Sequence, residues 1–317
     1  MVLHISNAKA FIAVLLTCFF LNSLSQHLHC SSNLIECAKP KSDVDLIEFF
    51  LNLEYLEAEF FLFGATGHGL DSFAPELAQG GPSPIGAKMA NLDPLTKNVI
   101  YQFALQKIGH LRAVKRTVKG FPRPLLNISM EAFAQIMHNS AGELLDPPFN
   151  PYANFINYLF ASYLIPYLSL TGYMGASPQL QNATSKKLVA GLLGAESGQA
   201  GVIQSMVDTR PRVLALPYNI TVEEFENLIS KQRNELGRKC LKDEGLEAPI
   251  FARKVYAYDK YIIPCPTTPK EILRIVYGGG DEHVPGGFFP KGAHGSIAKS
   301  YLKTVAWLYI IFLLCKT

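Results

Sequence analysis

Carboxylate and imidazole side chains that could bind a metal occur in three separate parts of the 317-residue sequence. Glu54 and Glu57 stand three residues apart, His110 lies in a second segment, and Glu196 lies in a third. If these segments are helices packed side by side, all four side chains can face one interior. Carboxylates together with a histidine are ligands for a pair of metal ions, which would support oxidase or peroxidase chemistry.

Two positions depart from the pattern of a complete two-metal site. In four-helix proteins of that kind, two helices each give one Glu, and the other two each give a Glu-x-x-His pair. Lys107 stands where the pair ending in His110 should begin, and Gln199 stands where the His paired with Glu196 should be. A lysine ammonium opposes metal binding by charge repulsion, so we expect a degenerate site. We predict no cofactor, with iron or manganese as the alternative.

The third expected helix supplies no carboxylate, because no acidic residue occurs between Asp146 and Glu196. No charged residue of either sign occurs between Asp146 and Lys186, and such a run is long enough to cross a membrane. However, Asn154, Asn157 and five tyrosines make the segment too polar for a typical span. We therefore favour a central helix that other helices bury on most sides.

Hydrophobic periodicity predicts the helices that must position these side chains. Four long helices are expected over 43–63, 93–119, 150–173 and 185–207, with a short helix over 130–138 between the second and third. The fold class is thus mainly α: a four-helix bundle with a long crossover between its second and third helices.

Polar side chains lie on the inward rows of these helices, and they indicate a site because such rows are normally apolar. Glu57 lies on the central row of the first helix, and Glu54 lies on the adjoining row. Lys107 and His110 share the inward row of the second helix, where the lysine either serves as an internal counterion or extends outward to solvent. The outer face of the first helix is expected to carry Glu48, Asn52, Tyr55 and Glu59.

The sequence after residue 210 no longer has the pattern of long helices, and we expect it to form a mixed, loop-rich extension. We expect a helix over 222–236 that starts with a Thr221–Glu224 capping box, a β-leaning stretch over 251–263 and a short helix over 269–277. The sequence GGGDEHVPGGFFPKG follows, and it lacks the GK[ST] of a phosphate-binding loop. Its acidic triplet could bind a metal or form a solvated turn, and we favour the turn; the triplet is Asp281, Glu282 and His283.

The N-terminal end has the pattern of a signal peptide. A weakly basic start, an apolar stretch over 10–21 and the small-x-small pattern Ser23-Leu24-Ser25 predict cleavage after residue 25. We therefore expect a secreted protein, or one in the endomembrane lumen. Sequons for N-glycosylation agree with this route and lie at Asn127, Asn182 and Asn219.

Cysteine usage also suits an oxidising compartment. Four cysteines belong to the body of the chain, and we expect at least one bridge between the early pair and the late pair. Three pairings are compatible with the sequence, which does not choose among them. The disulfide candidates are Cys30, Cys37, Cys240 and Cys265.

The apolar tail over 305–315 is either a lipid-anchor signal or an extension that packs on the body, and we favour the extension. Membrane association is expected only in the first case. The formal charge of +3 is too balanced for a nucleic-acid partner, and no other partner is assigned. We divide the chain into a signal peptide (1–25), an N-terminal lead (26–42), the bundle (43–210), the extension (211–300) and the tail (301–317).

Five motifs occur in an order that resembles one known family. They are LNLEYLEAEFFLFGATGHGLD, FALQKIGHLRAV, SYLIPYLSLTGYMGA, AGLLGAESGQAGVI and GGGDEHVPGGFFPKG. Together they resemble the plant desiccation-related proteins with a ferritin-like domain, over roughly residues 43–301. The resemblance implies a ferritin-like bundle, accumulation under drying stress and no established reaction. The second-helix motif of that family is usually Glu-x-Gly-His, so Lys107 is a departure.

Three functions remain open from the sequence. We favour a stress-associated, non-catalytic protein whose degenerate site is filled by its own paired polar groups. The second reading is a metal-dependent oxidase or peroxidase that uses Glu57, His110 and Glu196 with an incomplete shell. The third is a surface-anchored binding protein that acts through its tail and the region after residue 210.

Overall fold

The structure, a computed structural model, describes residues 42–141, 145–237 and 265–302. Helices and a few isolated β-bridges make up the regular structure of these ranges. The helices are α2 (Asp43–Thr66), α3 (Leu70–Phe73), α4 (Pro75–Ala78), α5 (Pro94–Thr117), α6 (Met130–Ala141), α7 (Phe155–Ala176), η1 (Ser177–Gln179), α8 (Ala183–Asp208), α9 (Val222–Gly237) and α10 (Pro269–Val276).

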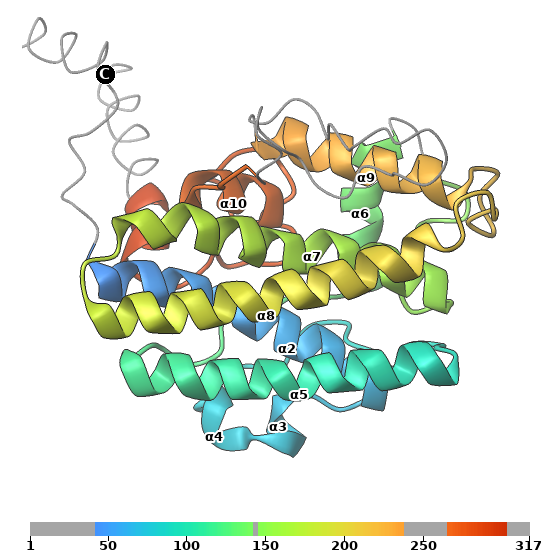
Figure 1. Ribbon diagram of the computed structural model, residues 1–317. Coiled ribbons are helices and arrows are strands. Elements are labelled where there is room, and N and C mark those ends of the chain that lie inside the picture. Colours follow the sequence, from blue (N-terminus) through green and yellow to red (C-terminus); the bar gives the residue numbers. More distant parts are fainter. Residues whose placement is uncertain (1–41, 142–144, 238–264, 303–317) are drawn as a thin grey trace, which may run out of the picture. The chain divides into compact units, whose positions relative to one another are not determined.

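Four long helices, α2, α5, α7 and α8, run alongside one another as a bundle (Figure 1). Helix α2 packs chiefly against α5, and α7 packs chiefly against α8. The long connection from α5 to α7 contains α6 and joins these two helix pairs. This arrangement confirms the predicted mainly α fold and its crossover between the second and third helices of the bundle.

The helices begin where capping residues satisfy their first free N–H groups. Ser42 and Asp45 form a capping box at the start of α2, and Asp93 caps α5 just before Pro94. The predicted capping box at the start of α9 is confirmed, because the Thr221 hydroxyl and backbone N–H both bond Glu224 Oε2. These caps place the bundle helices within a few residues of their predicted limits.

The prediction that α2 has a polar outer face exposed to solvent was wrong. Asn52, Tyr55 and Glu59 are buried, at 2%, 0% and 0% exposure, and Glu48 alone of that set is partly open. Helices α3 and α4 and the segment after α5 cover this side of α2. The Tyr55 hydroxyl donates to the carbonyls of Leu77 and Phe121 there. A helix buried all round carries polar groups on every side only when each has a partner.

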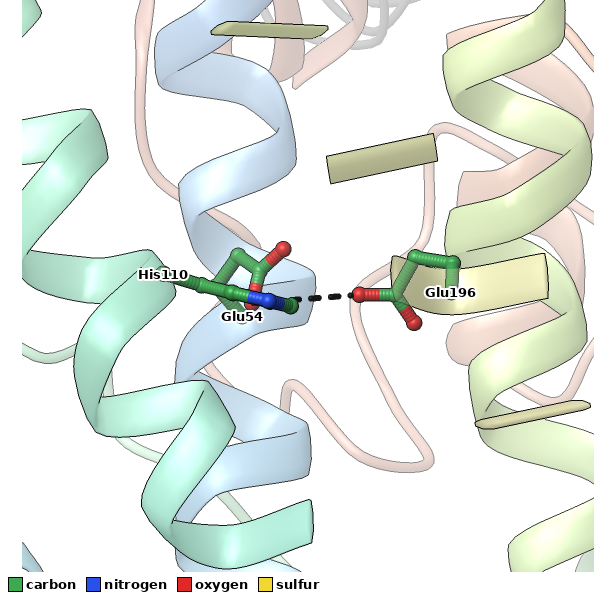
Figure 2. A group of neighbouring side chains, drawn as sticks. All are labelled: Glu54, His110 and Glu196. Atoms are coloured by element: carbon green, nitrogen blue, oxygen red, sulfur yellow. Dashed lines mark hydrogen bonds and ion pairs between the residues drawn. The ribbon is translucent and has the colours of Figure 1, made fainter. Parts of the chain in front are cut away.

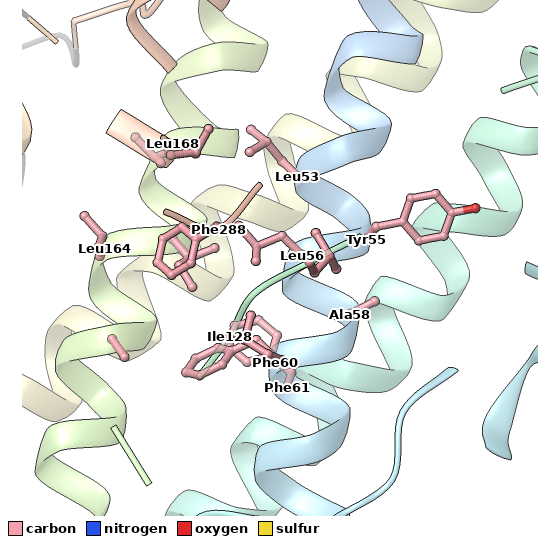
Figure 3. Packing of buried hydrophobic residues seen from close by; sticks show 14 of the residues in the cluster. Leu53, Tyr55, Leu56, Ala58, Phe60, Phe61, Ile128, Leu164, Leu168 and Phe288 are labelled. Atoms are coloured by element: carbon pink, nitrogen blue, oxygen red, sulfur yellow. The ribbon is translucent and has the colours of Figure 1, made fainter. Parts of the chain in front are cut away.

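Residues 265–302 contribute side chains to the core of the bundle. Phe288 is fully buried and meets Phe133 of α6 edge to face at 5.0 Å. Figure 3 shows Phe288 among buried residues of α2 and α7, including Leu56 and Leu164. Residues 265–302 therefore belong to the same compact unit as the bundle, which begins at Ser42.

Several sequence-based expectations fall on parts of the chain outside the described ranges. These are the signal peptide, three of the cysteines, the β-leaning stretch and the apolar tail. Cys265 is disulfide-bonded, and the identity of its partner stays a prediction. Among the helices of the described residues, none is long and apolar enough to cross a membrane.

Candidate functional site

Three helices of the bundle bring the predicted site residues together. Glu54 and Glu57 extend from α2, Lys107 and His110 from α5, and Glu196 from α8. Figure 2 shows Glu54, His110 and Glu196 directed at one another from these helices. The side chains of the three glutamates and Lys107 are 0% exposed, and that of His110 is 14% exposed.

Lys107 is an internal counterion, as one of the two sequence-based interpretations predicted. Its ammonium donates to Glu196 Oε1 and contacts Glu57 Oε2. Glu54 Oε2 lies 3.6 Å from the same Nζ atom. A fully buried ammonium in contact with three carboxyl groups does not extend to solvent, so the alternative interpretation was wrong.

His110 lies on the outer side of this cluster and links two of the carboxylates. Its Nδ1 atom is 3.2 Å from Glu54 Oε2 and 3.4 Å from Glu196 Oε1. Because its ring is the only partly exposed part of the five-residue cluster, it is the point at which solvent comes nearest to the buried charges.

Helix α7 contributes hydroxyl groups where a two-metal site would have a carboxylate. Ser169 donates a hydrogen bond to Glu57 Oε1, and the Tyr173 hydroxyl donates to Glu54 Oε1 at 2.7 Å. From the sequence, the tyrosine counts among the polar groups of this helix, but neither side chain was assigned to the site. Their i, i+4 spacing on α7 is the signal that would have placed them on one face.

Gln199, at the second replaced position, is directed away from the cluster. Its Nε2 donates to Gln106 Oε1 at 2.7 Å, so this pair joins α8 to α5 beside the site. The buried atoms Gln199 Oε1 and Glu196 Oε2 have no hydrogen-bond partner within the described part of the chain.

Burial and neighbouring charges set the protonation of the cluster. Burial raises the pKa of Glu57 to about 8, and the charges of Glu196 and Glu54 add to the effect. Burial opposes the ionisation of Glu54 too, but Lys107 and His110 outweigh it and lower that pKa to about 2. The neutral form of Glu57 thus relieves repulsion among three closely packed carboxyl groups.

The pKa values of the two basic groups, His110 and Lys107, are both raised by the neighbouring carboxylates. Burial disfavours the charge of His110, but Glu54 and Glu196 outweigh burial and raise its pKa to about 9. Burial also opposes the charge of Lys107, and the surrounding carboxylates raise its pKa well above the ordinary value. Near neutral pH Lys107 and His110 therefore both carry a charge beside the ionised Glu54, while Glu57 holds a proton.

These residues do not fit a pair of metal ions. Such a pair needs several anionic ligands to offset its charge. Here the ammonium of Lys107 already sits among the three carboxyl groups, and α7 adds none. Within this cluster, three residues could still hold a single metal ion: Glu54, His110 and Glu196 offer ligand atoms within 4.8 Å of one another. Lys107 contacts both carboxylates of this triad.

The acidic triplet Asp281, Glu282 and His283 forms a second cluster, in which the charge of Glu282 is already paired. Glu282 is bonded to Arg274 at 2.6 Å and to Lys270 at 3.1 Å, and it is only 5% exposed. His283 Nδ1 bonds the Tyr301 carbonyl at 2.9 Å. The expected solvated turn is therefore wrong for Glu282, because Arg274 draws its carboxylate inward onto α10.

The bundle, its crossover and the carboxylate–histidine cluster at its centre define a ferritin-like protein. The family model for the ferritin-like domain matches residues 42–209. A relative in Nesocodon mauritianus, the ferritin-like catalase Nec2, is 50% identical over 269 residues, which cover 83% of this chain and 86% of that one.

A second relative points to the same family. The desiccation-related protein PCC13-62 of Craterostigma plantagineum is 49% identical over 263 residues, which cover 81% of this chain and 84% of that one. The chain therefore belongs to the desiccation-related proteins with a ferritin-like domain. No solved structure matches it.

Proposed function

We propose that this chain is a secreted, desiccation-associated protein whose ferritin-like site is degenerate and does no metal catalysis. The observation that carries the proposal is the position of Lys107, whose buried ammonium contacts Glu54, Glu57 and Glu196. A metal pair would have to displace this ammonium and leave a buried charge without partners. Breaking a buried ion pair in that way costs about 3 to 5 kcal/mol.

A core whose buried charged groups pair with one another, and not with a metal, suits a protein that accumulates during drying. The hydrogen bonds from Ser169 and Tyr173 and the contacts of Lys107 give the carboxyl oxygens of Glu57 and one oxygen each of Glu54 and Glu196 a partner without any bound ion. The fold would then be insensitive to the supply of metal. The name of the Craterostigma relative supports the association with desiccation.

The second candidate is a metal-dependent peroxidase or catalase. The name of the Nesocodon relative and the triad of Glu54, His110 and Glu196 favour it. If the triad held a single metal, the metal would supply the redox chemistry, and the two glutamates and His110 would hold it. Lys107 opposes that arrangement because its ammonium bonds the same carboxylates.

Metal content and peroxide consumption separate the two candidates. The full chain is purified from a secretory host, and its iron, manganese and zinc are measured by mass spectrometry, with the Nesocodon catalase as the positive control. The proposal expects metal far below one ion per chain and no peroxide consumption above buffer. One metal per chain, with peroxide consumption that Glu54→Gln abolishes, would establish the second candidate instead.

The surface-anchored alternative depends on residues 303–317, which lie outside the described ranges. Treatment of intact cells with a phospholipase that cuts lipid anchors tests it, because release of the protein into the medium would establish anchoring.

A further inference from the structure

The loop between α8 and α9 exposes a group of apolar side chains. Val213, Leu214 and Leu216 are 47%, 44% and 65% exposed. The loop is tightly closed, because Leu214 pairs with Thr221 in an antiparallel bridge and the Ala215 N–H donates to the Ile220 carbonyl. This short loop therefore offers three accessible apolar side chains to a neighbouring group.

An exposed sequon lies within the same loop. Asn219 begins the sequence Asn-Ile-Thr and is exposed, while its neighbour Tyr218 is 5% exposed. Because the chain folds back on itself between residues 214 and 221, Asn219 lies in the closed turn that also contains Leu216. A group attached to its side chain would extend from the same short loop as these apolar side chains.

Asn182 is a second sequon with an accessible asparagine. It is exposed and caps α8, and its Oδ1 accepts from the backbone N–H groups of Thr184 and Ser185. A glycan is attached through Nδ2, which the cap does not use. Glycosylation and capping are therefore compatible at this position.

Asn127 differs from both because its sequon is built into the core. Its backbone N–H donates to the Phe288 carbonyl, and its side-chain Oδ1 accepts from the Ser129 N–H. Ser129, the hydroxyl residue of this sequon, is 7% exposed, and Ile128 between them is fully buried. A glycan at Asn127 would have to leave a half-buried side chain that two buried residues follow directly.

We propose that the chain carries N-glycans on Asn182 and Asn219 but not on Asn127, and that the Asn219 glycan covers the apolar loop of Val213, Leu214 and Leu216. The first sugar has an apolar ring face and an acetyl methyl that can lie against these side chains, and its hydroxyls remain in water. The assignment rests on the secretory route that the proposed function includes.

Peptide mapping by mass spectrometry, on the full chain purified from a secretory host, tests which sites are modified. We expect glycans on the peptides of Asn182 and Asn219 and an unmodified Asn127. Asn182→Gln and Asn219→Gln should each remove one glycan from the intact mass, whereas Asn127→Gln should leave the mass of the carbohydrate unchanged.

A second experiment tests whether the Asn219 glycan covers the apolar side chains of the loop. Asn219→Gln should increase the fluorescence of an apolar dye and the tendency to aggregate, whereas Thr184→Ala, which removes the Asn182 sequon and leaves the Asn182 cap in place, should do neither. Enzymatic removal of glycans from the folded wild-type protein should reproduce the Asn219→Gln result, so the outcome does not depend on how the variant folds.

Different failures have different meanings. A glycan on Asn127, an unmodified Asn219 in a chain that lacks residues 1–25, or equal dye binding by the two variants would overturn this inference alone. A chain that keeps residues 1–25 and carries no glycan at any sequon would overturn both the secretory route and the glycan assignment.

Discussion

Asn52 of α2 holds the main chain of His294 by two hydrogen bonds, although 242 residues separate them in sequence. Its Nδ2 donates to the His294 carbonyl at 2.8 Å, and its Oδ1 accepts from the His294 N–H at 2.7 Å. The same Nδ2 also donates to the Phe49 carbonyl. One amide therefore ties the C-terminal segment to the central helix.

Replacement of this amide should loosen the C-terminal segment. Asn52→Ala removes both hydrogen bonds and leaves main-chain groups of His294 without their partner, so we expect a loss of about 2 kcal/mol in the free energy of unfolding. Urea unfolding followed by circular dichroism measures it, with the exposed Asn98→Ala on α5 as the matched control. Equal midpoints for the two variants would contradict this role.

Removal of the internal ammonium should be more damaging. Lys107→Ala leaves Glu54, Glu57 and Glu196 buried together without their counterion, and the expected loss is about 3 to 5 kcal/mol. Thermal melts measure it, with Lys97→Ala on the exposed side of the same helix as the control. A Lys107→Ala melt that matches the parent would show that the carboxylates do not need the lysine.

Reversal of the charge at this position should create a metal requirement. Lys107→Glu places a fourth carboxylate in the cluster, so the metal-free variant should be less stable than the parent because of repulsion. It also restores the Glu-x-x-His pair with His110, so the affinity for a divalent transition metal should rise.

Calorimetric titration with Co²⁺ and melts with and without Co²⁺ measure these two effects. Lys107→Gln is the control, since it removes the ammonium without adding a ligand charge. We expect Co²⁺ to raise the melting temperature of Lys107→Glu alone. If Lys107→Gln gains as much, the added carboxylate is not the cause.

The cluster also predicts how stability depends on pH. Glu54 has a folded pKa of about 2 against an ordinary 4.5, so its contribution is present above pH 4.5 and is lost as the pH falls toward 2. Glu57 keeps its proton in the folded state up to about pH 8, so stability falls as the pH rises from 4.5 to 8. His110 acts in the same direction, and its contribution disappears between pH 6.5 and about 9.

The three contributions together place the stability maximum in the mildly acidic range. Melting temperatures measured from pH 3 to 9 should peak near pH 5 and decline toward pH 9. Glu57→Gln should flatten the part of the decline that lies below pH 8, because glutamine stays neutral in both states. A parent protein whose stability rises steadily between pH 5 and 9 would contradict this assignment of protons.

Local rules predicted much of the fold. Periodicity placed the four long helices, and capping residues such as Ser42 and Asp93 placed their starts, because both signals depend on neighbours in sequence. The same rules placed Glu57, Lys107 and Glu196 on inward rows, and the structure brings these residues together.

The remaining contacts depend on which distant segment covers each face. Periodicity shows that Tyr55 and Glu59 lie opposite the bundle interior, but it does not reveal that another layer covers them. Arg123, 64 residues after Glu59 in sequence, pairs with it there at 1% exposure. Likewise, the donors Ser169 and Tyr173 reach Glu57 and Glu54 only through the register between α7 and α2, which no local pattern encodes.

Lys107 also has a genetic consequence. Lysine and glutamate codons differ in the first base alone, so a single point mutation separates an interior filled by an ammonium from one that offers a fourth carboxylate. The helices, caps and hydroxyl donors around position 107 need not change. Within one lineage, the interior with Lys107 and an interior with a Glu-x-x-His pair on α5 can therefore arise from each other by one heritable step.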